Sequence, residues 1–184
     1  MADEFISKIT KAMSEVKVGS PLEEGVVMGP LSTEDGLNNV ENMVNCAVEN
    51  GAKVLTGGKR VDTAKGYYYE PTVLVNVDNS FEIMREEVFG PVLPIATFTT
   101  LDEAIELSND CQYGLTSAIF TQDINNMMRA SNELDFGETY VNRESFEAIQ
   151  GFHAGRKKSG VGGADGKHGL EEFLQTHVVY IQYN

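Results

Sequence analysis

Residues 84–95 read MREEVFGPVLPI, and this run carries the most information about the chain. Glu87 and Phe89 are separated by one residue, so an extended backbone points both side chains to the same side. Gly90 and Pro91 then favour a turn into the apolar strand that follows. The run therefore predicts an edge that offers a carboxylate and an aromatic ring to one pocket. Taken alone, it also fits a charged turn followed by a buried strand.

The chain has 184 residues, of which 41% are hydrophobic and 23% are charged. This length fits one domain, or one domain with an appendage, and is sufficient to bury a sizeable core. The sequence contains neither a low-complexity tract nor an apolar run long enough to span a bilayer. We therefore expect a folded, soluble protein without a membrane segment.

Acidic residues outnumber basic ones by 28 to 14, which gives a formal net charge of −14. This excess disfavours binding to the phosphates of nucleic acids and to anionic membranes. The first residues are acidic and lack the basic region and long apolar core of a secretory signal. Two cysteines without a short spacing predict neither a disulfide framework nor a metal cluster. Together these features favour the cytoplasm.

Helical periodicity alternates with β-branched runs along the first 142 residues. Helices are predicted over 5–16, 40–48, 100–107 and 123–134. Strands are predicted over 53–56, 72–77, 92–98, 113–120 and 138–142. Strands that alternate with helices imply an α/β fold with a largely parallel sheet.

The pattern breaks after residue 142 into an irregular stretch that runs to residue 169 and contains seven glycines. Long ordered loops in compact domains are usually functional, so we expect site residues here. Residues 170–174 fit a short helix, and 177–183 form a strong strand candidate at the terminus. That strand either adds to an earlier strand or pairs with another subunit. We therefore separate a main portion, 1–169, from a C-terminal helix and strand, 170–184.

Several motifs resemble those of the NAD(P)-dependent aldehyde dehydrogenase family and fall in that family's order and rough spacing. They are EVFGP at 87–91, VGSP at 18–21, MGPL at 28–31, GYYYEPT at 66–72, YGLT at 113–116 and KSG at 158–160. The resemblance extends almost from end to end. Within the family, GETYVNRE at 137–144 and QGFHAG at 150–155 are most similar to lactaldehyde and glycolaldehyde dehydrogenases.

The resemblance implies the three-layer catalytic domain of this family, with a largely parallel sheet and a C-terminal oligomerisation strand. It also implies roles for five residues. Glu87 would bind the nicotinamide ribose of NAD, or NADP, and Phe89 would lie beside the nicotinamide ring. Asn142 matches a residue near the active-site mouth, although a strand-end capping role fits it equally well. Glu147 and His153 match positions that line the aldehyde tunnel.

Many relatives carry aromatic or apolar groups where this chain has Glu147 and His153. Buried polar groups must be satisfied, so this pair suits an aldehyde that carries its own hydroxyl group. The alternative is a solvated glutamate and a structural histidine. Elsewhere the family pattern is broken at Ala164, where many members carry a glutamate, so a proton-relay carboxylate is not expected there.

The resemblance also implies parts that the motifs of this chain do not include: the Rossmann-type cofactor domain, the nucleophilic cysteine and the general-base glutamate. Cys46 and Cys111 lie outside the family's cysteine motif and are expected to be inert thiols. The glycine-rich run 160–166 fails the dinucleotide fingerprint, and the three histidines lack the spacing of a helical metal site. We thus expect no catalytic residue and no metal site.

These features predict the C-terminal portion or split subunit of an enzyme that oxidises a short hydroxyaldehyde, such as lactaldehyde, to its carboxylate. The chain alone is predicted to be inactive, with an N-terminal aldehyde dehydrogenase half as a possible partner. A homo- or hetero-oligomer through the terminal strand is expected. The alternative is a non-catalytic oligomerising or assembly protein derived from the same family.

Overall fold

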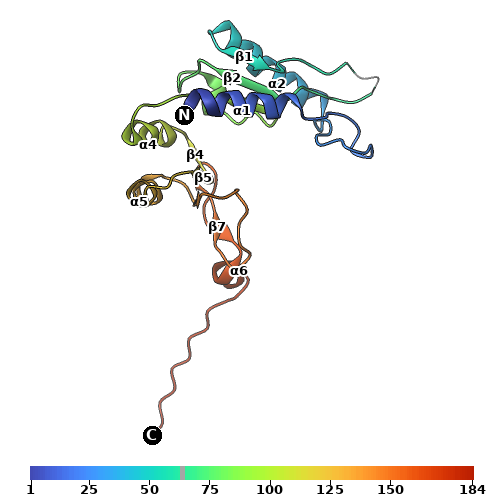
Figure 1. Ribbon diagram of the computed structural model, residues 1–184. Coiled ribbons are helices and arrows are strands. Elements are labelled where there is room, and N and C mark those ends of the chain that lie inside the picture. The colour runs from blue at the N-terminus through green and yellow to red at the C-terminus, as the bar shows by residue number, and fades with distance from the viewer. Residues whose placement is uncertain (63–64) are drawn as a thin grey trace. The chain divides into compact units, whose positions relative to one another are not determined.

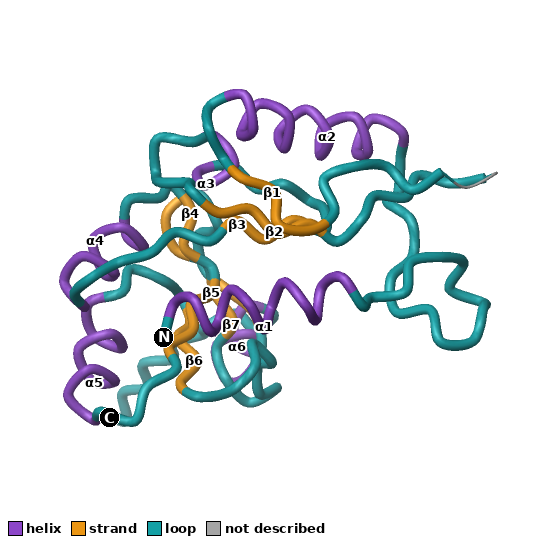
Figure 2. Tube along the Cα trace, turned by 45° about the horizontal axis from the view of Figure 1, so that its top comes forward, coloured by secondary structure: helices purple, strands orange, loops and turns teal. Residues whose placement is uncertain are grey.

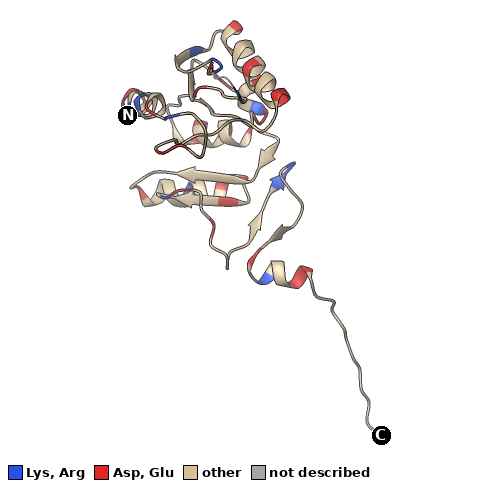
Figure 3. Ribbon diagram, turned by 90° about the vertical axis from the view of Figure 1, so that its right-hand side faces the viewer, with Lys and Arg blue, Asp and Glu red and all other residues tan. Residues whose placement is uncertain are grey.

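The computed structural model describes residues 1–62 and 65–184 (Figure 1). The chain divides into two compact units, Met1–Phe98 and Thr99–Asn184. Acidic residues occur in both units, together with lysine and arginine (Figure 3). Among the described residues, no helix is both long and apolar enough to cross a membrane.

The first unit is built around a three-stranded sheet in the order β1-β2-β3. Its elements are α1 (Ala2–Ser14), α2 (Glu34–Glu49), β1 (Lys53–Thr56), β2 (Thr72–Val75), α3 (Glu82–Arg85) and β3 (Val92–Pro94). Figure 2 shows the sheet with α2 on one side and α1 on the other. The central strand β2 is fully buried at Thr72, Val73 and Leu74. This unit therefore has the three-layer arrangement of an α/β fold.

Helix α2 forms because one side of it is apolar and its first turn is capped. Its buried side chains recur at helical spacing and are those of Leu37, Val40, Met43, Val44 and Ala47. The Thr33 hydroxyl accepts a hydrogen bond from the backbone N–H of Gly36, 3.0 Å away. The apolar stripe packs with Leu74, Val77, Ile83 and Val88 into the main core.

The second unit contains three two-stranded sheets and three helices. The helices are α4 (Leu101–Asn109), α5 (Ile124–Glu133) and α6 (Gly166–Glu172). The strands are β4 (Tyr113–Gly114), β5 (Thr116–Ile119), β6 (Glu138–Val141), β7 (His153–Ala154), β8 (Arg156–Lys157) and β9 (Gly163–Ala164). β5 runs parallel to β6, whereas β4 pairs with β8 and β7 with β9 in antiparallel fashion.

Helix α4 begins as its sequence predicts, with a small difference in the cap. Thr100 Oγ1 accepts a hydrogen bond from the backbone N–H of Glu103 at 3.2 Å. The Glu103 carboxylate accepts its principal backbone hydrogen bond from the N–H of Thr99, at 2.7 Å, one residue before the Thr100 cap. The hydrogen bonds from Thr99 hold the pKa of Glu103 below its usual range.

The α/β class is confirmed, but the prediction of one largely parallel sheet is wrong. β2 and β3 are parallel, as are β5 and β6, while β1 meets β2 antiparallel. The physical reason in the first unit is that the two arms of the connection between β1 and β2 pair with each other: the Val61 N–H donates to the Tyr68 carbonyl at 3.0 Å, and the Glu70 N–H to the Lys59 carbonyl at 2.9 Å. A connection that folds back in this way joins antiparallel strands, whereas parallel strands are usually joined by a helical crossover.

The region between residues 142 and 169 is less irregular than predicted, because β7, β8 and β9 lie within it. Residues 177–183, by contrast, pair with no strand in the described part of the chain. The prediction that this segment adds to an earlier strand is therefore wrong. β propensity favours an extended backbone but supplies no partner for its hydrogen bonds. Its pairing with another subunit and the boundary after residue 169 remain predictions.

Candidate functional site

Glu87 and Phe89 lie in the loop between α3 and β3, on either side of a buried anchor. Val88 is only 9% exposed and belongs to the main core, whereas Phe89 is 77% exposed. Glu87 is also exposed. The core contact of Val88 thus leaves a carboxylate and an aromatic ring at the surface of the first unit.

The predicted extended backbone across this loop is wrong at one residue. Phe89 has φ +51°, in the left-handed region. The next residue explains why the chain bends here: a Cβ at Gly90 would overlap the side chain of Val40 on α2. Gly90 lets the loop lie directly against the helix, and the bend at Phe89 leads the chain there.

A three-residue hydrogen-bond cluster lies in the second unit, on β6 and β7. Tyr140 Oη donates to Glu138 Oε2 at 2.7 Å, and His153 Nδ1 lies 2.9 Å from Glu138 Oε1. Glu138 and Tyr140 are two residues apart on β6 and so lie on the same side of the strand. β7 supplies His153. One carboxylate therefore joins a phenol and an imidazole.

The three groups shift one another's acidity. Burial raises the pKa of Glu138, but the hydrogen bonds from Tyr140 and His153 lower it by more, so the net shift is downward. The same bond to Glu138 raises the pKa of Tyr140 to about 12. The hydrogen bond between His153 and Glu138 raises the pKa of His153, and the negative charges of Glu138, Glu147 and Asp165 raise it further. Glu138 is thus held as a carboxylate and His153 is biased toward its protonated form.

Glu147 lies exposed in the loop between β6 and β7. Its negative charge reaches both His153 and Tyr140, since it raises the pKa of each. The neighbouring Arg143 guanidinium lies 5.8 Å from the centroid of the Tyr140 ring and 3.8 Å from the carboxylate of Glu144. Arg143 and Glu144 thus form a local ion pair at an exposed position, where it contributes little stability.

Asn142 ends β6 and joins it to the strand beside it. Its Oδ1 accepts from the backbone N–H of Thr121 at 2.8 Å, and its Nδ2 donates to the backbone carbonyl of Thr121 at 2.8 Å. The residue has φ +54°, a conformation that asparagine tolerates better than most residues. The strand-end role is thus directly visible, whereas contact with a substrate stays a prediction.

The structure brings Glu147 and His153 into one electrostatic environment, and Glu87 and Phe89 into one loop of the other unit. Sequence reasoning missed Glu138 and Tyr140. Their signal was the alternation of two polar side chains on one side of a predicted strand. The partner of Glu138, His153, is 15 residues away, and no local pattern reveals that contact.

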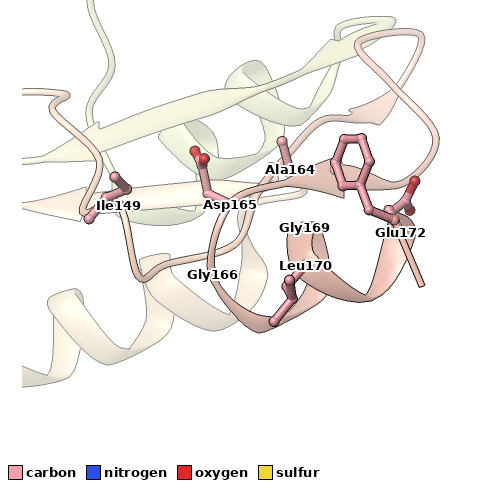
Figure 4. A pocket seen from close by; sticks show the side chains of 9 residues that line it. Ile149, Ala164, Asp165, Gly166, Gly169, Leu170 and Glu172 are labelled. Carbon is pink, nitrogen blue, oxygen red and sulfur yellow. The ribbon is translucent and has the colours of Figure 1, made fainter.

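A cavity of about 700 Å³ lies beside α6 (Figure 4). It is lined by Ile149, Gly163, Ala164, Asp165, Gly166, Gly169, Leu170, Glu172 and Phe173. None of the five predicted site residues lines it. Asp165 connects it to the site electrostatically, because its charge helps to raise the pKa of His153.

Each of the two cysteines has a hydrogen-bond partner near it in sequence. Cys46 Sγ accepts from Asn50 Nδ2 at 3.5 Å on α2, and Cys111 Sγ accepts from the backbone N–H of Tyr113 at 3.4 Å. In the part of the chain that the structure describes, no three His, Cys, Asp or Glu side chains gather as metal ligands.

Comparison with known proteins gives a consistent picture. The profile of the aldehyde dehydrogenase family matches residues 1–179. Lactaldehyde dehydrogenase of Escherichia coli is 56% identical over 181 residues, which are 98% of this chain and 38% of that protein. Its crystal structure matches with a TM-score of 0.95 over 99% of this chain and 38% of that chain.

More distant relatives extend the match. The 3,6-anhydro-α-L-galactose dehydrogenase of Vibrio sp. is 41% identical over 99% of this chain and 38% of that protein. The structure of betaine aldehyde dehydrogenase from Staphylococcus aureus in complex with NAD⁺ is 38% identical, with a TM-score of 0.90 over 94% of this chain and 35% of that chain. The chain thus spans well under half the length of these relatives.

Proposed function

Because the chain belongs to the aldehyde dehydrogenase family, we propose that it forms part of an NAD(P)-dependent enzyme that oxidises a short hydroxyaldehyde, such as lactaldehyde, to its carboxylate. The 56% identity to lactaldehyde dehydrogenase supports this substrate class over others in the family. The cluster of Glu138, Tyr140 and His153 is the observation that carries the proposal. It offers fixed hydrogen-bonding groups where an apolar aldehyde would need none.

We propose that Glu87 and Phe89 face the nicotinamide end of the cofactor. The exposed carboxylate of Glu87 suits the hydroxyl groups of a ribose, because an ionised carboxylate accepts hydrogen bonds only. The exposed ring of Phe89 suits a flat heterocycle. NAD is the proposed cofactor, with NADP as the alternative, and when bound it supplies the acceptor for the hydride.

Glu147 and His153 are the proposed substrate-binding pair. The carboxylate of Glu147 accepts a hydrogen bond from the substrate hydroxyl, and His153 donates one to an oxygen of the same substrate. An aldehyde without the hydroxyl would leave these groups unsatisfied on binding, which costs about 1–3 kcal/mol per group. Asn142 is proposed to lie near the mouth of this pocket while it holds the end of β6.

The nucleophilic cysteine, the general base and the dinucleotide domain are proposed to come from outside these 184 residues. The environments of Cys46 and Cys111 support this, since neither thiol lies in the cluster around Glu138 and neither is bonded to a base. The chain alone is therefore expected to be inactive. The proposed partner is an N-terminal aldehyde dehydrogenase half, in the cytoplasm.

Complementation tests this proposal. The purified chain is mixed with an N-terminal half of lactaldehyde dehydrogenase that carries the cysteine, and NADH formation is followed with lactaldehyde. We expect no NADH from either part alone and NADH from the mixture. Robust NADH production from the chain alone would contradict the proposal, and so would an inactive mixture in which the two parts bind each other.

A second candidate, an assembly protein, is favoured by one observation. The terminal segment exposes Val178, Val179, Tyr180, Ile181 and Tyr183, all more than 60% accessible. An extended, apolar and unpaired segment of this kind suits pairing with a second subunit. Self-association of the chain without any effect of nucleotide would favour this candidate over the enzyme.

A further inference from the structure

Glu138 holds the imidazole of His153 on one side of the ring and is itself held by Tyr140. We infer that Glu138 is a positioning residue, which keeps the proton of His153 on Nδ1 and directs Nε2 toward an oxygen of the bound hydroxyaldehyde. The first half of this inference concerns the chain alone. The second half rests on the proposed function.

Glu138 is held by both its backbone and its side chain. The backbone N–H of Glu138 donates to the carbonyl of Leu115 at 3.0 Å, and the backbone carbonyl of Glu138 accepts from the Ser117 hydroxyl at 3.1 Å. Its side chain is 13% exposed, and the hydroxyl of the buried Tyr140 donates to Oε2. The other oxygen, Oε1, is thereby fixed in position to meet His153.

The backbone of His153 is also fixed. β7 pairs with β9, where His153 lies opposite Ala164 and Ala154 opposite Gly163. A Cβ at residue 163 would overlap the carbonyl oxygen of His153, so the close pairing of β7 and β9 requires glycine at this position. The imidazole therefore projects from a defined point toward Glu138.

The chemistry of the pair determines where the proton lies. An ionised carboxylate has no hydrogen to donate, so the ring nitrogen that faces it must carry one. His153 therefore holds a hydrogen on Nδ1 in both its neutral and its charged form. Nε2 accepts a hydrogen bond when the ring is neutral and donates one when the ring is protonated.

The charges around the ring favour the donating form. Three carboxylates act on His153: Glu138 from β6, Glu147 from the loop before β7, and Asp165 from the turn before α6. The guanidinium of Arg143 lies over the Tyr140 ring, 5.8 Å from its centroid. A donor at His153 beside an acceptor at Glu147 complements a hydroxyl group, which both accepts and donates.

The test is nitrogen NMR of the imidazole in the intact chain, with Glu138→Gln as the variant. Glutamine has the shape of glutamate, but its amide nitrogen would face His153 Nδ1 as a donor. We expect long-range ¹H–¹⁵N spectra above the pKa to show the Nδ1–H tautomer in the wild type and the Nε2–H tautomer in Glu138→Gln. We also expect the pKa of His153 to fall in the variant.

Tyr140→Phe is the matched control, because it removes one hydrogen bond to Glu138 but keeps the carboxylate. We expect this variant to retain the Nδ1–H tautomer. An unchanged tautomer in Glu138→Gln would overturn the inference, provided that the variant shows the wild-type dispersion of backbone signals. If Glu138→Gln unfolds, Glu138→Ala replaces it: loss of the Nδ1–H tautomer supports the inference, and an Nδ1–H tautomer that persists without the carboxylate contradicts it.

A second readout separates this inference from the proposed function. In the complemented enzyme, kcat/KM for lactaldehyde relative to propanal is compared between wild type, Glu138→Gln and His153→Phe. We expect both variants to lower this ratio roughly tenfold. A ratio that falls in His153→Phe but not in Glu138→Gln would overturn the positioning role alone. A ratio that falls in neither would overturn the proposed function, while the tautomer would still decide whether Glu138 controls the proton.

Discussion

The side-chain amide of Asn142 bonds twice to the backbone of Thr121, at 2.8 Å through Oδ1 and 2.8 Å through Nδ2. The two residues lie just beyond the paired strands β6 and β5. A single side chain thereby joins the ends of both strands at the start of the loop that carries Glu147. The contribution of this contact to the free energy of unfolding can be measured without an activity assay.

Asn142→Ala is expected to reduce the free energy of unfolding by about 1–2 kcal/mol, since two exposed hydrogen bonds are lost and alanine tolerates the left-handed φ poorly. Asn142→Gly loses the same bonds without the backbone strain, so its loss should be smaller. Urea denaturation of both variants measures the difference. Equal stability of Asn142→Ala and wild type would show that the Thr121 contacts contribute nothing.

Gly90→Ala is expected to destabilise the first unit by about 1–3 kcal/mol, because the new Cβ overlaps the side chain of Val40. Val40→Ala alone creates a cavity, and in the double variant that space accommodates the added methyl group. The double-mutant cycle should therefore give a favourable coupling of about 0.5–3 kcal/mol. Strict additivity of the two single losses in urea denaturation would argue against this contact.

Much of the first unit follows from local patterns. The apolar stripe over 40–48 predicts a helix, and the structure contains it within α2, which begins earlier, at Glu34, behind a cap at Thr33. The β-branched run after Pro71 likewise predicts the buried strand β2. In these elements, local preference and tertiary burial favour the same conformation.

The remaining features depend on contacts that are distant in sequence. β7 and β9 have two residues each, too few to show a period of two. The left-handed Phe89 follows from the approach of Gly90 to α2, which no local signal reports. The hydrogen bond between Glu138 and His153 forms only when β6 and β7 are both folded. Sequence patterns therefore pointed to His153 but not to Glu138.

Phe89→Ala is expected to raise the KM for NAD in the complemented enzyme about tenfold, if the exposed ring contributes about 1.4 kcal/mol of contact with the nicotinamide. Glu87→Gln should raise the same KM by a smaller factor, since an amide oxygen still accepts one hydrogen bond. Phe98→Ala, which removes another exposed aromatic ring of the first unit, is the matched control and should leave KM unchanged. Equal KM values for Phe89→Ala and wild type would exclude the proposed contact.

The pairing of Glu138 and His153 makes stability depend on pH in a defined way. The pKa of His153 is raised in the folded state, so its contribution is fully present below the unfolded value of about 6.5 and is lost as pH rises through the higher folded value. The pKa of Glu138 is lowered, so its contribution is present above the unfolded value of about 4.3 and is lost as pH falls through the lower folded value.

The stability difference between wild type and His153→Gln is therefore expected to be largest between these two titrations and to shrink above pH of about 6.5. Urea midpoints measured from pH 5 to pH 9, a range of roughly the width needed to cover the histidine titration, give this difference directly. Glu138→Gln should reduce the pH dependence of that difference to the smaller part contributed by the charges of Glu147 and Asp165. A difference that grows with rising pH would contradict the direction of the His153 shift.

The preference of the complemented enzyme for a hydroxyaldehyde tests the central claim most directly. The measurement is kcat/KM for lactaldehyde divided by kcat/KM for propanal, in wild type and in Glu147→Phe. We predict that the wild type prefers lactaldehyde and that Glu147→Phe lowers the ratio roughly tenfold, because the hydroxyl group loses its acceptor. A ratio that is unchanged by Glu147→Phe would contradict the account.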